Sequence, residues 1–313
     1  MSNNLRQKTR KKKGIKILVT GGAGFLGIKL IAGLKKAGYK KIKSFDIVSG
    51  QNLLNKGQVD NAIKNSDVVF HLAAVADLNY ARKHPRESMD INVVGTINVA
   101  DACAKYNKTL NFASTCCAYG NQEKHPITED NPPRPTELYA HSKLAGENII
   151  QAYASQFGFK YNILRLATFY GEGMRPALAP FIFLQKAIRH EPITVHGTGK
   201  QTRTFTHVSD VVDAMIKILE KGVVNEIINI TTEEEISVNN MAKMAISVAN
   251  SKSDIKFTAD RPGQIYTEKH SAKKAARLLD WEAKIPFEKG FNEIHKWMSK
   301  DHKSVDGYRP KNK

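Results

Sequence analysis

The chain has 313 residues, of which 41% are hydrophobic and 25% are charged, so it can bury a large core and is not disordered as a whole. It contains no run of about 18 apolar residues, and we expect neither a membrane span nor a secretory signal peptide. Its three cysteines, Cys103, Cys116 and Cys117, match no disulfide framework and no zinc-site spacing. These features favour a cytoplasmic protein without a bound metal.

The net charge of +18 is partly concentrated in six Lys and Arg residues between positions 6 and 13. We interpret residues 1–13 as a solvated, disordered arm. A basic arm can also bind RNA or an anionic membrane surface, so nucleic acid stays open as a partner.

Strand and helix patterns alternate along the first half of the chain. A β-branched run at 15–20 ends in glycines and predicts a buried strand, and apolar residues at helical spacing follow over 28–37. Further strands are predicted at 43–47, 67–72, 109–114 and 161–166, with helices at 58–64, 92–106 and 139–157. The alternation predicts an α/β fold with a Rossmann-type, doubly wound parallel sheet.

The pattern becomes less regular after residue 166. We expect a Rossmann domain at 14–166, with residues 205–232 returning to it. Residues 167–204 and 233–300 then form a smaller C-terminal α/β lobe that binds substrate, and 301–313 form a loose tail.

Three glycines follow the first predicted strand at a spacing of three. Gly21 can make the tight turn, Gly24 lets a pyrophosphate approach backbone N–H groups, and Gly27 allows close packing of helix on strand. The helix that begins there favours phosphate at its N-terminus. Asp46 ends the second strand about 20 residues later, where a carboxylate binds ribose hydroxyls and favours NAD over NADP.

Tyr139 and Lys143 are four residues apart on a predicted helix, so they share one face. A tyrosine with an ordinary pKa of about 10 is a poor base at neutral pH, and a neighbouring ammonium lowers that pKa. The strand ending at Thr115 brings a hydroxyl to the same end of the sheet. This order of features predicts proton transfer beside a dinucleotide.

The sequence resembles the extended short-chain dehydrogenase/reductase family, in the NAD-dependent epimerase/dehydratase branch that includes enzymes like UDP-glucose 4-epimerase. The resemblance covers roughly residues 15–298. The segments that carry it are 20–27, 71–74, 92–96, 114–120, 139–143, 203–210, 261–263 and 279–281.

The resemblance implies that Tyr139 is the catalytic base, Lys143 its partner, and Thr115 the hydroxyl that aids proton transfer. It implies a homodimer formed through the helices at 92–106 and 139–157. The residues it assigns to NAD are Gly21, Gly24, Phe25, Leu26, Gly27, Asp46, Leu72, Ala73, Ala74, Asn92, Tyr139 and Lys143.

For the nucleotide-sugar substrate, the resemblance assigns Arg203 and Arg261 to the diphosphate, for which a fork of N–H donors is suited. Thr168 stands where many relatives carry an Asn that contacts substrate. Asn52, in place of an acidic residue, is expected to reach the adenine of NAD.

The resemblance implies one opening step, in which Tyr139 takes a proton from a sugar hydroxyl while hydride passes to NAD⁺. A dehydratase would carry an Asp-Glu pair after Thr115, where this chain has Cys116 and Cys117. We therefore favour 4-epimerisation of a UDP-hexose. Cys117 lies two residues before Tyr119, where related 3,5-epimerases carry an acid/base Cys, so a 3,5-epimerase or a keto-sugar reductase is the alternative. An RNA-binding protein on the same fold is a third.

Overall fold

The computed structural model describes residues 14–260 and 266–300, and the basic arm, the C-terminal tail and Arg261 lie outside these ranges. The chain divides into two compact units. Among the described residues, unit 1 comprises 14–167, 212–230 and 273–281, and unit 2 comprises 168–211, 231–260, 266–272 and 282–300.

Unit 1 is built on a six-stranded parallel sheet in the order β10-β5-β4-β3-β1-β2. Its strands are β1 (Lys16–Thr20), β2 (Lys41–Phe45), β3 (Val68–His71), β4 (Thr109–Thr115), β5 (Tyr161–Leu166) and β10 (Glu226–Ile230). The chain runs outward from β1 to β2 and then returns to the other side of β1 with β3. This reversal confirms the doubly wound fold, in which ligands bind at the carboxyl ends of the strands beside the switch point.

The central strands are buried on both faces, as is usual for a parallel sheet covered by helices. In β1, residues 17–20 are all buried, and in β4 only Thr109 is not fully buried. The main core of unit 1 joins these strands to the apolar sides of α3 (Lys56–Lys64), α6 (Gly95–Tyr106) and α7 (Leu138–Phe157).

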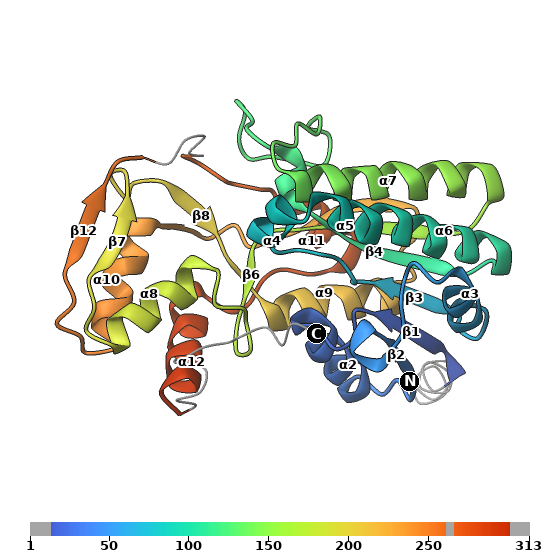
Figure 1. Ribbon diagram of the computed structural model, residues 1–313, viewed down its shortest axis with the longest axis horizontal. Helices are drawn as coiled ribbons and strands as arrows, with labels where there is room; N and C mark the ends of the chain where they lie inside the picture. The colour runs from blue at the N-terminus through green and yellow to red at the C-terminus, as the bar shows by residue number, and fades with distance from the viewer. Residues whose placement is uncertain (1–13, 261–265, 301–313) are drawn as a thin grey trace. The chain divides into compact units, whose positions relative to one another are not determined.

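Helices cover both faces of the sheet (Figure 1). The helices α3, α6 and α7 pack side by side on one face. On the other face, α2 (Phe25–Lys36) packs against α9 (Val208–Lys221), and a Cβ on Gly33 would lie 2.5 Å from a Val212 methyl carbon. Short helices join the strands near their carboxyl ends: η1 (Ile47–Ser49), α4 (Leu78–Lys83), α5 (Pro85–Met89), the π-helix η2 (Asp90–Val94) and η3 (Cys116–Tyr119).

Unit 1 includes a segment that the sequence analysis did not assign to it. Residues 273–281 return to unit 1 through α11 (Lys273–Leu279), which packs against β10. Lys274 forms an ion pair with Glu226 at 2.8 Å, and Trp281 is buried. The long-range contacts of α11, rather than its local pattern, therefore determine where this segment belongs.

The described residues of unit 2 form three two-stranded sheets and three helices. The strand pairs are β6 (Phe169–Tyr170) with β9 (Thr206–His207), β7 (Ile193–His196) with β12 (Ile255–Thr258), and β8 (Thr202–Thr204) with β11 (Glu235–Ser237). The helices are α8 (Ala179–Ile188), α10 (Val238–Val248) and α12 (Phe287–Lys300). Buried rings of Tyr170, Phe205, Phe287 and Phe291 pack together at the start of α12.

Within the described residues, no helix combines the length and apolar character needed to cross a bilayer.

Candidate functional site

The glycine turn after β1 has the geometry that a phosphate-binding turn requires. Gly21 has a φ of +71°, and a Cβ there would lie 2.7 Å from the Ala73 amide nitrogen. A Cβ on Gly27 would lie 2.1 Å from the Gly21 carbonyl oxygen, so helix α2 can approach the turn only without a side chain at this position. Gly24 is the N-cap residue of α2, and no side chain caps the helix. The first turn of α2 can therefore offer its backbone N–H groups to a pyrophosphate.

Asp46 lies at the carboxyl end of β2, beside this turn. Its carboxylate accepts hydrogen bonds from the Ala23 amide at 2.9 Å and the Val48 amide at 3.1 Å. These bonds hold the carboxylate against the glycine turn, and its remaining lone pairs can accept ribose hydroxyls.

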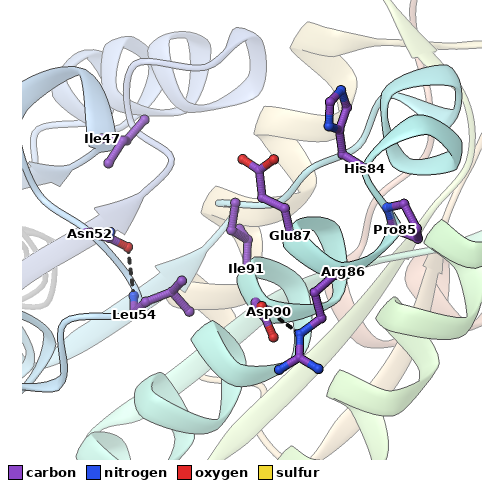
Figure 2. A pocket seen from close by; sticks show the side chains of 9 residues that line it. All are labelled: Ile47, Asn52, Leu54, His84, Pro85, Arg86, Glu87, Asp90 and Ile91. Carbon is purple, nitrogen blue, oxygen red and sulfur yellow. Dashed lines mark hydrogen bonds and ion pairs between the residues drawn. The ribbon is translucent and has the colours of Figure 1, made fainter. Parts of the chain in front are cut away.

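A pocket of about 560 Å³ is lined in part by Ile47, the residue that follows Asp46 in the chain. Figure 2 shows the side chains that line it. One side is formed by the segment after β2, where Asn52 Oδ1 accepts the Leu54 amide at 2.9 Å. The other side is formed by residues 84–91, where Arg86 pairs with Asp90 at 3.0 Å. The nine lining residues are Ile47, Asn52, Leu54, His84, Pro85, Arg86, Glu87, Asp90 and Ile91. Apolar walls with a few amide and charged groups suit a heteroaromatic base.

Tyr139 and Lys143 lie in the first turns of α7, which packs against β4 and η3. Lys143 is 2% exposed, and its ammonium lies 4.0 Å from the centroid of the Phe112 ring in β4. Burial lowers the pKa of Lys143 to about 7, although Glu147 one turn further along opposes that shift. A lysine so placed retains its charge only when anionic or polar groups come close to it.

Thr115 ends β4 and is the N-cap residue of η3. Its Oγ1 accepts the Cys117 amide at 3.1 Å, which leaves its hydroxyl hydrogen to donate elsewhere. Cys116 is buried and donates from Sγ to the Arg165 carbonyl at 3.2 Å, whereas Cys117 is exposed. The two adjacent thiols therefore occupy different environments, and only Cys117 is open to a ligand.

Glu147 joins α7 to the sheet, a contact that the sequence analysis did not predict. It accepts the Ser114 hydroxyl and forms an ion pair with Arg165 at 2.7 Å, with both charged side chains at most 4% exposed. Burial opposes the charge of Arg165, but its bonds to Glu147 outweigh burial and raise its pKa. Tyr139, Lys143 and Glu147 follow one another at a spacing of four, so they lie on one face of the helix. This spacing is the sequence pattern from which the contact of Glu147 with the sheet could have been predicted.

Asn92 has protein partners for its whole side-chain amide. Its Oδ1 accepts the Val75 amide at 2.7 Å, and its Nδ2 donates to the Val75 carbonyl at 3.1 Å and to Ser142 Oγ at 2.9 Å. Ser142 in turn donates to the Tyr139 carbonyl at 2.7 Å. Asn92 therefore joins the loop after β3 to the first turn of α7.

Thr168 and Arg203 belong to unit 2. Arg203 forms an ion pair with Glu268 at 3.3 Å and donates to the Thr202 carbonyl at 2.7 Å. Burial raises the pKa of Glu268, while Arg203 opposes that shift. Thr168 accepts the Thr206 amide through its carbonyl oxygen at 2.9 Å.

A family model described as the NAD dependent epimerase/dehydratase family matches residues 17–231, which carry the glycine turn, Asp46, Thr115, Tyr139 and Lys143. The chain belongs to this family. Its expected resemblance and its expected cofactor, NAD, are thereby confirmed.

Two relatives show how varied the chemistry of similar proteins is. A protein of Methanocaldococcus jannaschii named "Putative UDP-glucose 4-epimerase" is 31% identical over 92% of this chain and 100% of its own length. A "UDP-N-acetyl-alpha-D-glucosaminuronate decarboxylase" of Bacillus cytotoxicus is also 31% identical, over 90% of this chain and 97% of its own.

Solved structures are similar over most of the chain. The UDP-glucose 4-epimerase of Thermotoga maritima, solved with UDP-glucose, has a TM-score of 0.86 and 28% identity, covering 91% of this chain and 99% of that one. The UDP-glucose 4-epimerase of Thermus thermophilus, solved with NAD, has a TM-score of 0.82 and 25% identity over the same shares of the two chains. The chain is thus an NAD-dependent enzyme of the kind that modifies nucleotide-sugars.

Over residues 14–260 and 266–300, no group of three or more His, Cys, Asp or Glu side chains is arranged to hold a metal ion.

Proposed function

We propose that this enzyme is a nucleotide-sugar epimerase that inverts C4 of a hexose, most simply a UDP-hexose. The observation that carries the proposal is the arrangement of α7 on β4. A buried Lys143 lies one turn after Tyr139, and β4 ends in the hydroxyl of Thr115. Two hydroxyls and an ammonium at one sheet edge supply the groups needed to move a proton to and from a sugar alcohol.

In this mechanism Tyr139 accepts the proton of the sugar hydroxyl. The Lys143 ammonium stabilises the resulting phenolate, and burial strengthens that attraction because little water screens it. Thr115 donates its hydroxyl hydrogen to the substrate oxygen and so fixes its distance from Tyr139. The same groups return the proton after the sugar has turned its other face.

The residues around the glycine turn fit NAD. Bound NAD supplies the acceptor for the hydrogen removed from the sugar carbon. The amides at the start of α2 would hold its phosphates and Asp46 its adenosine ribose, while the pocket beside Asn52 would take its adenine. The Asp46 carboxylate would repel a ribose phosphate, which favours NAD over NADP.

Cys116 and Cys117 favour epimerisation over dehydration. Elimination of water needs an acid and a base near the sugar, and Cys116 is buried with its thiol directed at a backbone carbonyl. Cys117 alone is exposed. This exposure supports the second candidate, a 3,5-epimerase in which Cys117 exchanges a proton with the sugar, and a keto-sugar reductase stays an alternative.

We propose that Arg203 and Arg261 bind the substrate diphosphate, and that Thr168 and Cys117 are further residues that contact the substrate. Arg203 forms an ion pair with Glu268, so a diphosphate would either bind the Arg203 guanidinium together with that carboxylate or replace it. We also expect the protein to form a homodimer through α6 and α7.

The test is incubation of the purified protein with NAD⁺ and a panel of UDP-, GDP-, dTDP- and ADP-sugars, with products resolved by NMR. We expect one sugar to invert at C4. The Tyr139→Phe variant lacks the proton acceptor and should lose at least a factor of about 10² in turnover.

Tyr153→Phe removes a hydroxyl from the same helix and is the matched control, with wild-type turnover expected. Inversion at C3 or C5, abolished by Cys117→Ser, would favour the second candidate. Steady consumption of added NADPH would indicate a reductase. If no sugar changes although NAD binds, the epimerase proposal is wrong.

A further inference from the structure

A continuous chain of buried hydrogen bonds crosses the carboxyl end of the sheet in unit 1, with His71 at its centre. The side chains of Thr20, His71 and Thr96 are each at most 2% exposed. His71 Nδ1 lies 2.7 Å from Thr20 Oγ1, and His71 Nε2 lies 3.1 Å from Thr96 Oγ1. The parallel register explains the first contact, because Thr20 at the end of β1 pairs with His71 at the end of β3.

The groups at the two ends of this hydrogen-bonded chain determine which atom donates in each of its bonds. Thr96 Oγ1 lies 2.6 Å from the Asn92 carbonyl oxygen, which can only accept, so the Thr96 hydroxyl hydrogen is directed there. Thr96 Oγ1 must then accept from His71, and Nε2 carries the proton. Nδ1 consequently accepts the Thr20 hydroxyl, and Thr20 Oγ1 accepts the Ala73 amide at 3.3 Å.

This arrangement admits only the neutral imidazole with hydrogen on Nε2. A second proton on Nδ1 would leave the Thr20 hydroxyl hydrogen without an acceptor in the chain. The positive charge of Lys143 disfavours a protonated His71 ring and so lowers its pKa, while Glu147 raises the pKa of Lys143. Burial and the Lys143 charge lower the pKa of His71 to about 3.

The hydrogen-bonded chain reaches one part of the site through Thr20 and another through Thr96. On the Thr20 side, the Ala73 amide lies directly over Gly21, where any Cβ would come within 2.7 Å of it. On the Thr96 side, Asn92 holds Val75 by two hydrogen bonds and donates to Ser142, which precedes Lys143 in α7. One ring therefore lies between the phosphate-binding turn and the proton-transfer helix.

We propose that His71 is a positioning residue with two separable functions: through Nδ1 it holds the cofactor-binding turn, and through Nε2 it holds η2 and α7 at the proton-transfer site. The assignment of those two places rests on the function proposed above. The tautomer and the two hydrogen-bonded halves are independent of which sugar is used.

Two substitutions separate the halves. In His71→Asn the side-chain amide reaches the position of Nδ1 and can still accept from Thr20, but it no longer reaches Thr96. In His71→Gln the amide reaches the position of Nε2 and can still donate to Thr96, but Thr20 loses its acceptor. His71→Leu removes both.

We expect His71→Gln to weaken NAD binding about tenfold while leaving kcat at saturating NAD within about twofold of wild type. We expect the reverse for His71→Asn: NAD affinity within about twofold and kcat about tenfold lower. Hydrogen exchange of the Val75 amide should accelerate in His71→Asn and not in His71→Gln, which reports on the Thr96 side without any sugar. Thr20→Val should behave like the Gln variant and Thr96→Val like the Asn variant.

The control is Asn111→Leu, which breaks the buried Asn111–Asn162 hydrogen bond of 2.9 Å in the same sheet. This variant should lower Tm, but it should not change NAD affinity and kcat by different factors. ¹⁵N NMR of the wild type should show His71 protonated on Nε2 and unchanged between pH 5 and about 8, where an ordinary histidine titrates near 6.5.

A His71 proton on Nδ1, or titration near 6.5, overturns the proposal. The proposal is also wrong if His71→Asn and His71→Gln both lose NAD affinity and kcat to the same extent, and if these losses only follow the decrease in Tm. If no sugar is turned over at all, the NAD affinities, the Val75 exchange and the NMR spectrum still decide it, so its failure is distinguishable from failure of the epimerase proposal.

Discussion

At the scale of single residues, Lys143 is buried, whereas the mechanism proposed above requires its side chain to be charged. It is 2% exposed, and what offsets the loss of water around its ammonium is the face of Phe112 and the more distant charge of Glu147. These are not enough, since burial still lowers the pKa of Lys143 to about 7. In the mechanism proposed above, the Tyr139 phenolate would complete the set of partners. The residue is therefore expected to destabilise the free protein and to stabilise the reacting complex.

Replacement by an uncharged side chain should reveal this conflict. The native pKa of about 7 lies below the unfolded value near 10.5, so between these pH values the unfolded chain binds a proton that the native state does not. Wild-type stability should therefore gain from this group as pH rises from 7 to about 10. Lys143→Met lacks that gain and should melt a few °C higher than wild type at pH 7, with turnover abolished.

The measurement is Tm of both proteins at pH 7 and pH 10, since the difference cancels groups they share. The Tm of Lys143→Met minus that of wild type should be smaller at pH 10 than at pH 7. An equal difference at both pH values would show that the charge of Lys143 does not destabilise the folded protein.

At the scale of elements, Glu147 joins α7 to two strands of the sheet by buried polar contacts. The carboxylate contacts Ser114 in β4 and Arg165 in β5, and Gly146 beside it lets α7 approach so closely that a Cβ would lie 2.8 Å from the Phe112 ring. Arg165 also lies 4.7 Å from the centroid of the Tyr119 ring in η3. Glu147 thus links the helix that carries Tyr139 to β4, which ends at Thr115, through Ser114 and to β5 through Arg165.

Glu147→Gln should be strongly destabilising, because it leaves the Arg165 guanidinium buried without a counter-charge. We expect a loss of about 3–5 kcal/mol in the free energy of unfolding, measured by urea denaturation. Lys105→Gln, which removes an exposed ion pair with Asp60, is the control and should cost less than about 1 kcal/mol. A similar small loss in both variants would contradict the role given to Glu147.

At the scale of the whole molecule, the charge is unevenly distributed along the chain. Thirteen of the 48 Lys and Arg residues precede Asp46, the first acidic residue. Seven of them lie in the described part of unit 1, in or next to β1, α2 and the edge strand β2. Among the described residues, none of these seven ammonium groups forms an ion pair with a carboxylate. This region presents a basic surface whatever the enzyme does.

We expect this surface to bind RNA weakly and without sequence preference. Affinity for a single-stranded RNA should fall steeply with salt, because counterion release dominates such binding, and deletion of residues 1–13 should lower the slope of log K against log salt. Sugar turnover should be unchanged by the deletion. Tight, sequence-selective binding that survives high salt would instead favour the RNA-binding alternative.

Local patterns in the sequence were sufficient to predict most of the sheet. The strand predicted at 161–166 is β5, and β10 lies within the segment 205–232 that was expected to return to the Rossmann domain. Both strands are rich in Ile and Leu, which favours buried strands. Helical spacing placed Tyr139 and Lys143 on one helix, α7. By contrast, residues 74–91 carry no clear period, and α4 and α5 were not predicted there.

The sequence by itself thus determined the fold class and the family, since both are carried by motifs and periodicities whose residues lie within a few positions of one another. Tertiary structure alone decided which groups surround the candidate site residues. Glu147 pairs with Arg165, which lies 18 residues away in the sequence, and His71 contacts Thr20, which lies 51 residues away. Lys274 pairs with Glu226, and residues of unit 2 separate the two in the sequence. Such pairs form because buried polar groups must find a partner in space, and no local pattern records which one.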